Sequence, residues 1–366
     1  MLLPENYVSN TLASNGNQTF LEANENEIQT GLVFIKVYKG GSYKYRFAYS
    51  GIIDTTFADG SESKCNDICP EWKIHSLEVA VTDSCKAENA DKLQFLPLTF
   101  SGKKSVTVDG DKIILTDDAE INADKDSFIC LKMTFSGKKI PCHKESIIAS
   151  FVKQNNEYVL SPLLPFPVFT GVKRNVKLKI AFIGDSITQG IGTEFNSYKH
   201  YASLVAENLS DEYAFWDLGI GFARGSDAAS DGIWLEKAKE NDIVSVCFGV
   251  NDIFKGHSEN EIKKDIETIV SKLKESGSAV ILQTVPPFDY DEKYAEIWQN
   301  INYFIKTELV KKADFIFDNV PILSKNGLDS PASKYGSHPN NDGNAVWAEK
   351  LTPVIKEICE KREAQP

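Results

Sequence analysis

The chain of 366 residues lacks the features that mark several special classes of protein. No apolar run approaches the roughly 18 residues that a membrane-spanning helix requires. Basic residues are in deficit, because 40 lysines and arginines stand against 52 aspartates and glutamates and leave a formal net charge of −12. Both halves of the chain share this acidic excess. We therefore expect no nucleic-acid or membrane partner, since phosphate backbones and anionic membrane surfaces attract basic proteins.

Cysteines are few and do not form the pattern of a disulfide framework. Their number is odd and they are scattered along the chain, at Cys65, Cys69, Cys85, Cys130, Cys142, Cys247 and Cys359. The stretch 1–20 has neither the basic segment nor the long apolar segment of a secretory signal. A reduced, cytoplasmic setting is the simplest interpretation. Zinc would need four ligands at a regular spacing, and Cys65, Cys69 and His75 do not provide it, so we expect no metal.

The length suits two domains of ordinary globular composition, at about 150 residues per domain. A boundary is marked in the segment 161–176, where Pro162, Pro165 and Pro167 stand close together. Such a run suits neither a helix nor a central strand. We predict a first domain over 1–160, a proline-rich linker over 161–176 and a second domain over 177–366.

The segment before the linker has the pattern of an all-β domain. Short stretches rich in β-branched and aromatic residues alternate with turn signals, which is typical of a β-sandwich. The turn at Asp109 and Gly110 and two copies of T-F-S-G-K-K, at 99–104 and 134–139, are interpreted as hairpin tips. No motif in this half points to a function of its own.

After the linker, strand-like and helix-like segments alternate. Nearly continuous apolar runs predict buried strands within 179–186, 214–220, 242–252, 278–288 and 314–323. Amphipathic patterns predict helices within 197–209, 226–241, 258–277, 291–313 and 345–361. Ser258 and Glu261 form the signature of a capping box. Five such units imply a parallel sheet covered by helices on both faces, with ligands bound beyond the carboxyl ends of the strands.

A serine stands where the first of these strands ends, in the run Gly184-Asp185-Ser186-Ile187-Thr188-Gln189-Gly190. Ser186 can present its hydroxyl to a crevice at this edge, and the flanking glycines leave room for a substrate. A serine that only caps the following helix would give the same local pattern.

Three further groups follow later strands or precede the last helix. Asn251 ends the third strand and can donate a hydrogen bond to an oxyanion, although an Asn-Asp pair is also common in plain turns. Gly219 and Gly221 end the second strand, where a backbone N–H can act as another donor. His338 supplies the base that a serine nucleophile needs, and alone it would be read as a surface histidine.

These four elements, in this order, resemble the SGNH hydrolase superfamily, also called the GDSL esterases and lipases. The resemblance covers about residues 176–362. It implies a three-layer α/β domain with a five-stranded parallel sheet, Ser186 as nucleophile and His338 as general base. It also implies an oxyanion hole formed by the N–H of Ser186, the N–H of Gly221 and the side chain of Asn251. Asp185 and Asp252 match positions that the family uses structurally.

The chain departs from the family pattern at two positions. A glycine is common in the family at the position of Phe222. An aspartate is common three residues before the histidine, and Tyr335 stands there instead. A histidine still acts if another acceptor fixes its tautomer, and the candidates are a backbone carbonyl, Asp342 and Asp329. We therefore predict a Ser–His dyad, as in some carbohydrate esterases of this superfamily.

A β-sandwich of jelly-roll type followed by an SGNH domain is also similar to carbohydrate esterase family two, whose members remove acetyl groups from sugars. The expected activity is that of a serine ester hydrolase that acts through an acyl-enzyme on an O-acetylated sugar or oligosaccharide, without a cofactor. The alternatives are a lipase, lysophospholipase or thioesterase of the same superfamily, or a catalytically silent carbohydrate-binding protein. The pattern does not indicate an oligomeric state.

Overall fold

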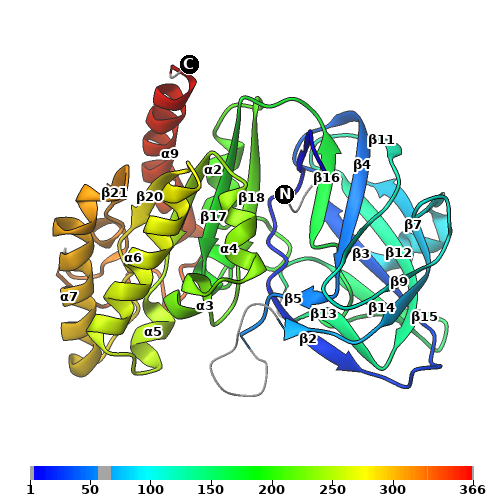
Figure 1. Ribbon diagram of the computed structural model, residues 1–366, viewed down its shortest axis with the longest axis horizontal. Coiled ribbons are helices and arrows are strands. Elements are labelled where there is room, and N and C mark those ends of the chain that lie inside the picture. Colours follow the sequence, from blue (N-terminus) through cyan, green and yellow to red (C-terminus); the bar gives the residue numbers. More distant parts are fainter. Residues whose placement is uncertain (1–3, 57–66, 145, 328, 365–366) are drawn as a thin grey trace. The chain divides into compact units, whose positions relative to one another are not determined.

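The computed structural model describes residues 4–56, 67–144, 146–327 and 329–364, and Figure 1 shows its ribbon. Contacts between residues divide the chain into two compact units, Met1–Asn175 and Val176–Pro366. None of the helices in the described ranges has the length and apolar character needed to cross a membrane. The described cysteines are free thiols. Of the residues considered as zinc ligands, Cys65 lies outside the described residues, whereas Cys69 and His75 lie within them.

The first unit is built from antiparallel strands in two main sheets. One sheet has the order β1 (Tyr7–Ser9), β16 (Phe169–Lys173), β4 (Gly41–Ser50) and β10 (Ile113–Leu115), and β11 (Ala119–Ala123) also pairs with β4. The other has the order β15 (Glu157–Leu160), β14 (Ser150–Gln154), β3 (Gln29–Lys36), β12 (Phe128–Gly137), β7 (Trp72–Thr82) and β8 (Leu96–Leu98), and β9 (Val106–Val108) also pairs with β7. Two short pairs join β2 (Asn17–Glu22) to β13 (Lys139–Lys144) and β5 (Ile52–Ile53) to β6 (Asp67–Ile68), and a 3₁₀ turn spans Ala87–Lys92.

Aromatic side chains fill the space between the two sheets. Tyr49 of β4 and Trp72 of β7 are both buried, and their rings meet edge to face with centroids 6.3 Å apart. Along much of β4 and β7, buried positions alternate with more exposed ones, which indicates that one face of each strand is turned to a core. The prediction of a strand-rich first half is confirmed, and the jelly-roll connectivity stays a prediction.

The proline-rich segment contains a β-strand, and its role as a linker stays a prediction. Strand β16 lies within it and pairs with β1 and β4. Just before the strand, the N–H of Val168 donates to the carbonyl of Ala48 at 2.8 Å. The three prolines, which have no N–H to donate, all precede this strand, and the five residues Phe169–Lys173 that follow them suit a sheet. The chain thus pairs with the first sheet until a few residues before Val176.

The second unit contains the predicted parallel sheet. Its order is β18 (Tyr213–Gly219), β17 (Leu178–Gly184), β19 (Ile243–Cys247), β20 (Ala279–Gln283) and β21 (Phe315–Phe317), and every pairing is parallel. Strands β18, β19 and β20 are buried at every residue, which requires cover on both faces. The prediction of a five-stranded parallel sheet is confirmed.

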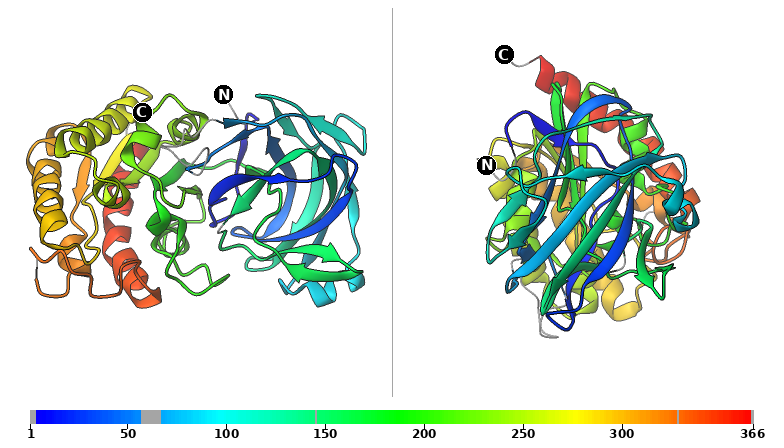
Figure 2. Two further views of the ribbon diagram at one scale, coloured as in Figure 1. Left: turned by 90° about the horizontal axis from the view of Figure 1, so that it is seen from below. Right: turned by 90° about the vertical axis from the view of Figure 1, so that its right-hand side faces the viewer.

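Helices provide that cover. They are α1 (Ser186–Gln189), α2 (Tyr201–Glu207), α3 (Gly225–Ala229), α4 (Ile233–Lys239), α5 (Val250–Phe254), α6 (Glu259–Glu275), α7 (Glu292–Thr307), α8 (Val320–Leu323) and α9 (Asn341–Glu363), and a 3₁₀ turn spans Leu309–Lys311. Figures 1 and 2 show α4 and α6 on one face of the sheet and α9 on the other. The expected capping box begins α6, where the N–H of Ser258 donates to Glu261 at 2.8 Å.

Candidate active site

Ser186 is the first residue of α1, directly beyond the carboxyl end of β17. The turn is held by Asp185, whose side chain caps α1 by accepting the N–H of Ile187 at 2.9 Å. It ends after one turn at Gly190, whose φ of 102° is in the left-handed region that favours glycine. Ser186 is therefore not the cap residue. Its hydroxyl is half-buried and its own N–H stands at a helix N-terminus without an intrahelical acceptor.

His338 meets this serine. Its Nε2 lies 2.8 Å from the Oγ of Ser186, although 152 residues separate the two in the chain. For the hydroxyl to donate to Nε2, the ring proton must be on Nδ1. The pair thus has the distance and the tautomer that proton transfer from the hydroxyl requires.

The imidazole of His338 is surrounded by apolar and backbone groups. The ring of Phe288 lies edge to face with it, with centroids 5.0 Å apart. Gly192 is close on another side, since a Cβ on this glycine would lie 2.7 Å from the Cβ of His338. Burial among such groups disfavours the charged imidazolium and lowers the pKa of His338 below 6.5.

Neither candidate carboxylate reaches His338. Asp342 lies exposed in the first turn of α9, and Asp329 lies exposed before Ser330. Within the described part of the chain, neither forms a hydrogen bond or ion pair with the histidine, whose one hydrogen-bond partner there is Ser186. Tyr335 packs beside Gly343, where a Cβ would lie 2.7 Å from the Cβ of the tyrosine.

Asn251 is the second residue of α5, beyond the carboxyl end of β19. Its Nδ2 donates to the carbonyl of Ala223 at 2.9 Å, which ties it to the turn that follows β18. The amide carries two N–H bonds, so one remains for a substrate oxygen. That turn in turn adjoins the serine strand, since the N–H of Ile220 donates to the carbonyl of Gly184 at 3.0 Å.

The turn after β18 contains Gly221 and Phe222. Its closing hydrogen bond runs from the N–H of Ala223 to the carbonyl of Ile220 at 3.3 Å. Phe222 adopts a φ of 59°, a left-handed conformation that favours glycine, and its ring is exposed. This backbone conformation explains why a glycine is common at this position in the family. The predicted donor Gly221 is buried in this turn, and its contact with an oxyanion stays a prediction.

Two buried carboxyl groups, those of Asp185 and Asp252, accept backbone N–H groups next to the site. Burial raises the pKa of Asp185 to about 7 and that of Asp252 to about 6. Both oxygens of Asp252 accept the N–H of Gly225, at 2.9 and 3.1 Å, at the start of α3. These contacts match the structural role expected of both residues.

Asp252 also belongs to a cluster of groups that could ligate a metal. Its carboxylate, the imidazole of His257 and the carboxylate of Asp265 have oxygen or nitrogen atoms within 4.8 Å of one another. Because Asp252 already holds the N–H of Gly225, its place in this cluster has a structural explanation. The absence of a metal from the reaction stays a prediction.

Sequence reasoning missed several residues that hold the site together. His200 is fully buried just before α2, and its Nε2 lies 3.0 Å from a carboxylate oxygen of the buried Asp217. Asn344 and Tyr201 connect the segments of His338 and Ser186. A polar residue at a position where a helical pattern expects an apolar one is a signal for such a role. The sequence does not show its partners, because they are distant in the chain.

A nucleophile, a base and a side-chain N–H donor thus stand at one edge of the sheet, which is the set required for acyl transfer. Residues 182–346 match the model of the GDSL-like Lipase/Acylhydrolase family. This part of the chain is a GDSL-like lipase/acylhydrolase domain. The match begins in β17 and ends in α9, so the GDSL-like domain includes Ser186, Asn251 and His338.

Several solved structures are similar to the chain. An acetyl xylan esterase is 22% identical, with 48% of this chain and 99% of that chain covered and a TM-score of 0.39. A lipolytic G-D-S-L family protein from Veillonella parvula is 16% identical, with 49% and 98% covered and a TM-score of 0.40. A psychrotrophic esterase from Pseudoalteromonas sp. is 16% identical, with 50% and 98% covered and a TM-score of 0.39. No curated protein matches the chain significantly.

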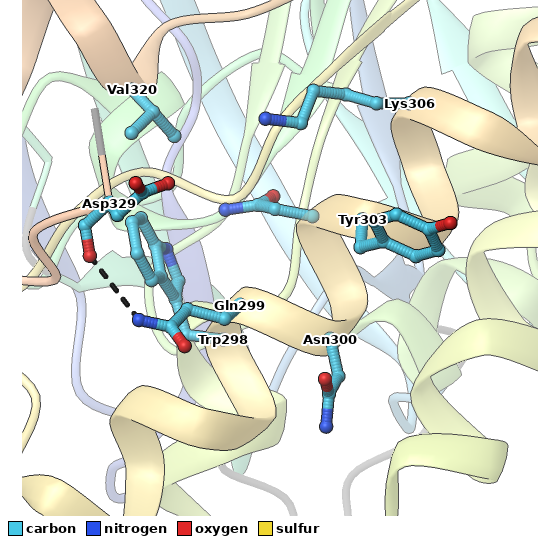
Figure 3. A pocket seen from close by; sticks show the side chains of 8 residues that line it. Trp298, Gln299, Asn300, Tyr303, Lys306, Val320 and Asp329 are labelled. Atoms are coloured by element: carbon cyan, nitrogen blue, oxygen red, sulfur yellow. Dashed lines mark hydrogen bonds between the residues drawn. The ribbon is translucent and has the colours of Figure 1, made fainter.

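A separate cavity of about 490 Å³ lies along α7 of the GDSL-like domain (Figure 3). Its lining consists of Trp298, Gln299, Asn300, Asn302, Tyr303, Lys306, Val320 and Asp329. The backbone carbonyl of Asp329 accepts a hydrogen bond from Gln299 here, at 3.3 Å. None of these lining residues pairs a hydroxyl or thiol with a histidine, so the cavity lacks the groups for acyl transfer.

Proposed function

We propose that this protein is a serine ester hydrolase that removes acetyl groups from O-acetylated sugars or oligosaccharides through an acyl-enzyme. The observation that carries the proposal is the distance of 2.8 Å between Ser186 Oγ and His338 Nε2 in the GDSL-like domain. Such a pair activates a hydroxyl that is otherwise a weak nucleophile.

The first half of the reaction forms the acyl-enzyme. The Oγ of Ser186 attacks the ester carbonyl carbon while its proton passes to Nε2 of His338. The carbonyl oxygen becomes an oxyanion, which accepts hydrogen bonds from the backbone N–H groups of Ser186 and Gly221 and from the side-chain amide of Asn251. The bond between the carbonyl carbon and the alcohol oxygen then breaks, and the imidazolium gives its proton to the departing sugar hydroxyl.

The second half releases the acid. A water molecule gives a proton to Nε2 of His338 and attacks the acyl carbon, and the same donors stabilise the second oxyanion. The bond to Ser186 then breaks, and the serine regains its proton from the imidazolium. The free carboxylic acid leaves, and no cofactor takes part in either half.

Three features support a sugar ester as the substrate. A first unit rich in strands joined to a GDSL-like domain resembles the layout of carbohydrate esterase family two. The dyad without a carboxylate resembles that of some sugar esterases. Aromatic rings also stand beside the base, since Phe288 contacts both His338 and the half-exposed Phe254. Aromatic rings provide flat apolar surfaces suited to the apolar faces of sugar rings.

The reaction class is tested by Ser186→Ala, assayed on acetylated sugars and on activated acetyl esters. We expect at least a thousandfold loss of kcat, because the variant has no nucleophile. Ser210→Ala is the matched control. Ser210 is also half-buried, but it precedes β18 and thus lies at the amino ends of the strands, away from the dyad. This variant should keep full activity. Turnover by Ser186→Ala close to that of the wild type would refute the proposed mechanism.

The substrate class is tested by a series of esters with acyl chains of increasing length. A deacetylase should lose kcat/KM steeply beyond short acyl groups. Sustained activity on long chains would instead favour a lipase, lysophospholipase or thioesterase. Binding of glycans with no turnover of any ester would identify a silent carbohydrate-binding protein.

A further inference from the structure

His338 must be positioned without the carboxylate that usually orients such a base. The role of that carboxylate is to fix the tautomer and the angle of the ring. In the described chain the ring has one hydrogen bond, to the very group it must deprotonate. Its placement therefore depends on the backbone that carries it.

That backbone is held by Asn344, a fully buried residue in the first turn of α9. Its Nδ2 donates to the carbonyl of Pro339 at 2.7 Å and to the carbonyl of Asn340 at 3.0 Å. Both N–H bonds of one amide are thus spent on the two residues that follow His338. The same side chain accepts the N–H of Tyr201 through Oδ1 at 2.8 Å.

Tyr201 extends this connection to the nucleophile. Its hydroxyl lies 3.0 Å from Oγ1 of Thr188, which is in the same single turn as Ser186. Its ring stacks on Trp347 of α9, with centroids 4.3 Å apart and planes 8° apart. Thr188, Tyr201, Asn344 and Trp347 are all buried, so these bonds do not compete with water.

We propose that Asn344 is the positioning residue of the base, taking the orienting part of the missing carboxylate by fixing the backbone that follows His338 at hydrogen-bonding distance from Ser186. This inference rests on the proposed function, since it concerns the same dyad. Asn344 touches neither Ser186 nor the ring of His338, so it acts through Pro339 and Asn340.

The test uses Asn344→Asp in the chain of 366 residues. This substitution keeps the shape and the oxygen that accepts from Tyr201 but removes both N–H bonds to the carbonyls. We expect kcat to fall about 10- to 100-fold, because a small displacement of a catalytic group has an effect of that order. KM should change less than twofold, because the residue is not in contact with the proposed substrate.

A pH profile distinguishes positioning from general loss of structure. The introduced carboxyl group is buried among carbonyls and holds its proton above the ordinary range, and its protonated form donates one hydrogen bond. The ratio of kcat in Asn344→Asp to kcat in the wild type should therefore rise as the pH falls. If this variant does not fold, Asn344→Ser, which keeps a neutral donor, takes its place and should show a smaller loss.

Asn241→Asp is the matched control. Asn241 is also buried, and its amide also donates to two carbonyls, those of Lys237 at 2.9 Å and Ala238 at 3.2 Å. It lies before β19, at the edge of the sheet away from the dyad. This variant should lose thermal stability and keep kcat at every pH.

The results separate the two proposals. Full kcat in Asn344→Asp, or an equal loss of kcat in Asn241→Asp, overturns the role of Asn344 while a dead Ser186→Ala variant still supports the esterase. If Ser186→Ala is as active as the wild type, the proposed function fails and the inference fails with it.

Discussion

At the scale of single residues, His338 combines two properties that a base at this site needs. Its Nε2 is 2.8 Å from the hydroxyl of Ser186, and burial lowers its pKa, which favours the neutral form. A neutral imidazole accepts a proton, whereas an imidazolium does not. Burial therefore favours the form of the base that the reaction requires.

This property predicts the pH dependence of the reaction. The pKa of His338 is lowered below 6.5, so the base stays neutral to a lower pH than an exposed histidine does. On an uncharged ester, kcat/KM should fall only on acidification below 6.5, because its pH profile reports the free enzyme. An NMR titration of the His338 ring, assigned with His338→Gln, should give the same midpoint. A fall in kcat/KM that begins above pH 6.5 and coincides with the titration of the His338 ring would contradict this account.

At the scale of elements, α5 shows how a strand end positions a functional side chain. Gly249 joins β19 to α5 with a φ of 126°, outside the range of most residues. A Cβ on it would lie 2.6 Å from a methyl group of Val285. The close approach of the two segments sets the start of α5 and with it the place of Asn251, which is two residues further on.

Gly249→Ala should therefore reduce both stability and activity. We expect the free energy of unfolding to fall by about 2–3 kcal/mol, from an overpacked contact and an unfavourable φ, and kcat to fall at least tenfold as Asn251 shifts. Gly256→Ala is the matched control, because Gly256 also has a positive φ, 80°, but a Cβ there would meet no atom within 4 Å. The control should lose about 1 kcal/mol and keep kcat. Equal kcat in the two variants would show that Gly249 does not position Asn251.

At the scale of the whole molecule, the chain forms two units with separate sheets and separate buried aromatic residues. Trp72 is buried in the first unit against Tyr49. Trp234 is buried in the second, where its Nε1 donates to the carbonyl of Leu218 at 2.8 Å. Each unit therefore has a core that a single substitution can weaken.

Calorimetry of the full chain should show two unfolding transitions. Trp72→Ala should lower the stability of one by about 3–5 kcal/mol, and Trp234→Ala should lower the other by a similar amount. Esterase activity should disappear on heating with the transition that Trp234→Ala shifts, because the dyad lies in that unit. A common shift of a single transition in both variants would show that the two units unfold as one.

The local sequence determined the elements and much of the candidate site. Apolar runs predicted the five parallel strands because strands covered on both faces are apolar throughout. The rule that ligands bind beyond the carboxyl ends of such strands placed Ser186 and Asn251 at the same edge. The capping box at Ser258 and Glu261 was predicted from the sequence because its two residues are only three positions apart in the chain.

Tertiary structure alone decided what surrounds the base. No local pattern relates His338 to Phe288 or Asn344 to Tyr201, since these contacts join segments that are 50 and 143 residues apart. The strand β16 beyond the prolines also depends on partners in β1 and β4 that are far away in the sequence. The type of residue at each position follows local rules, whereas its partners are set by long-range packing, and here that packing takes the place of a carboxylate.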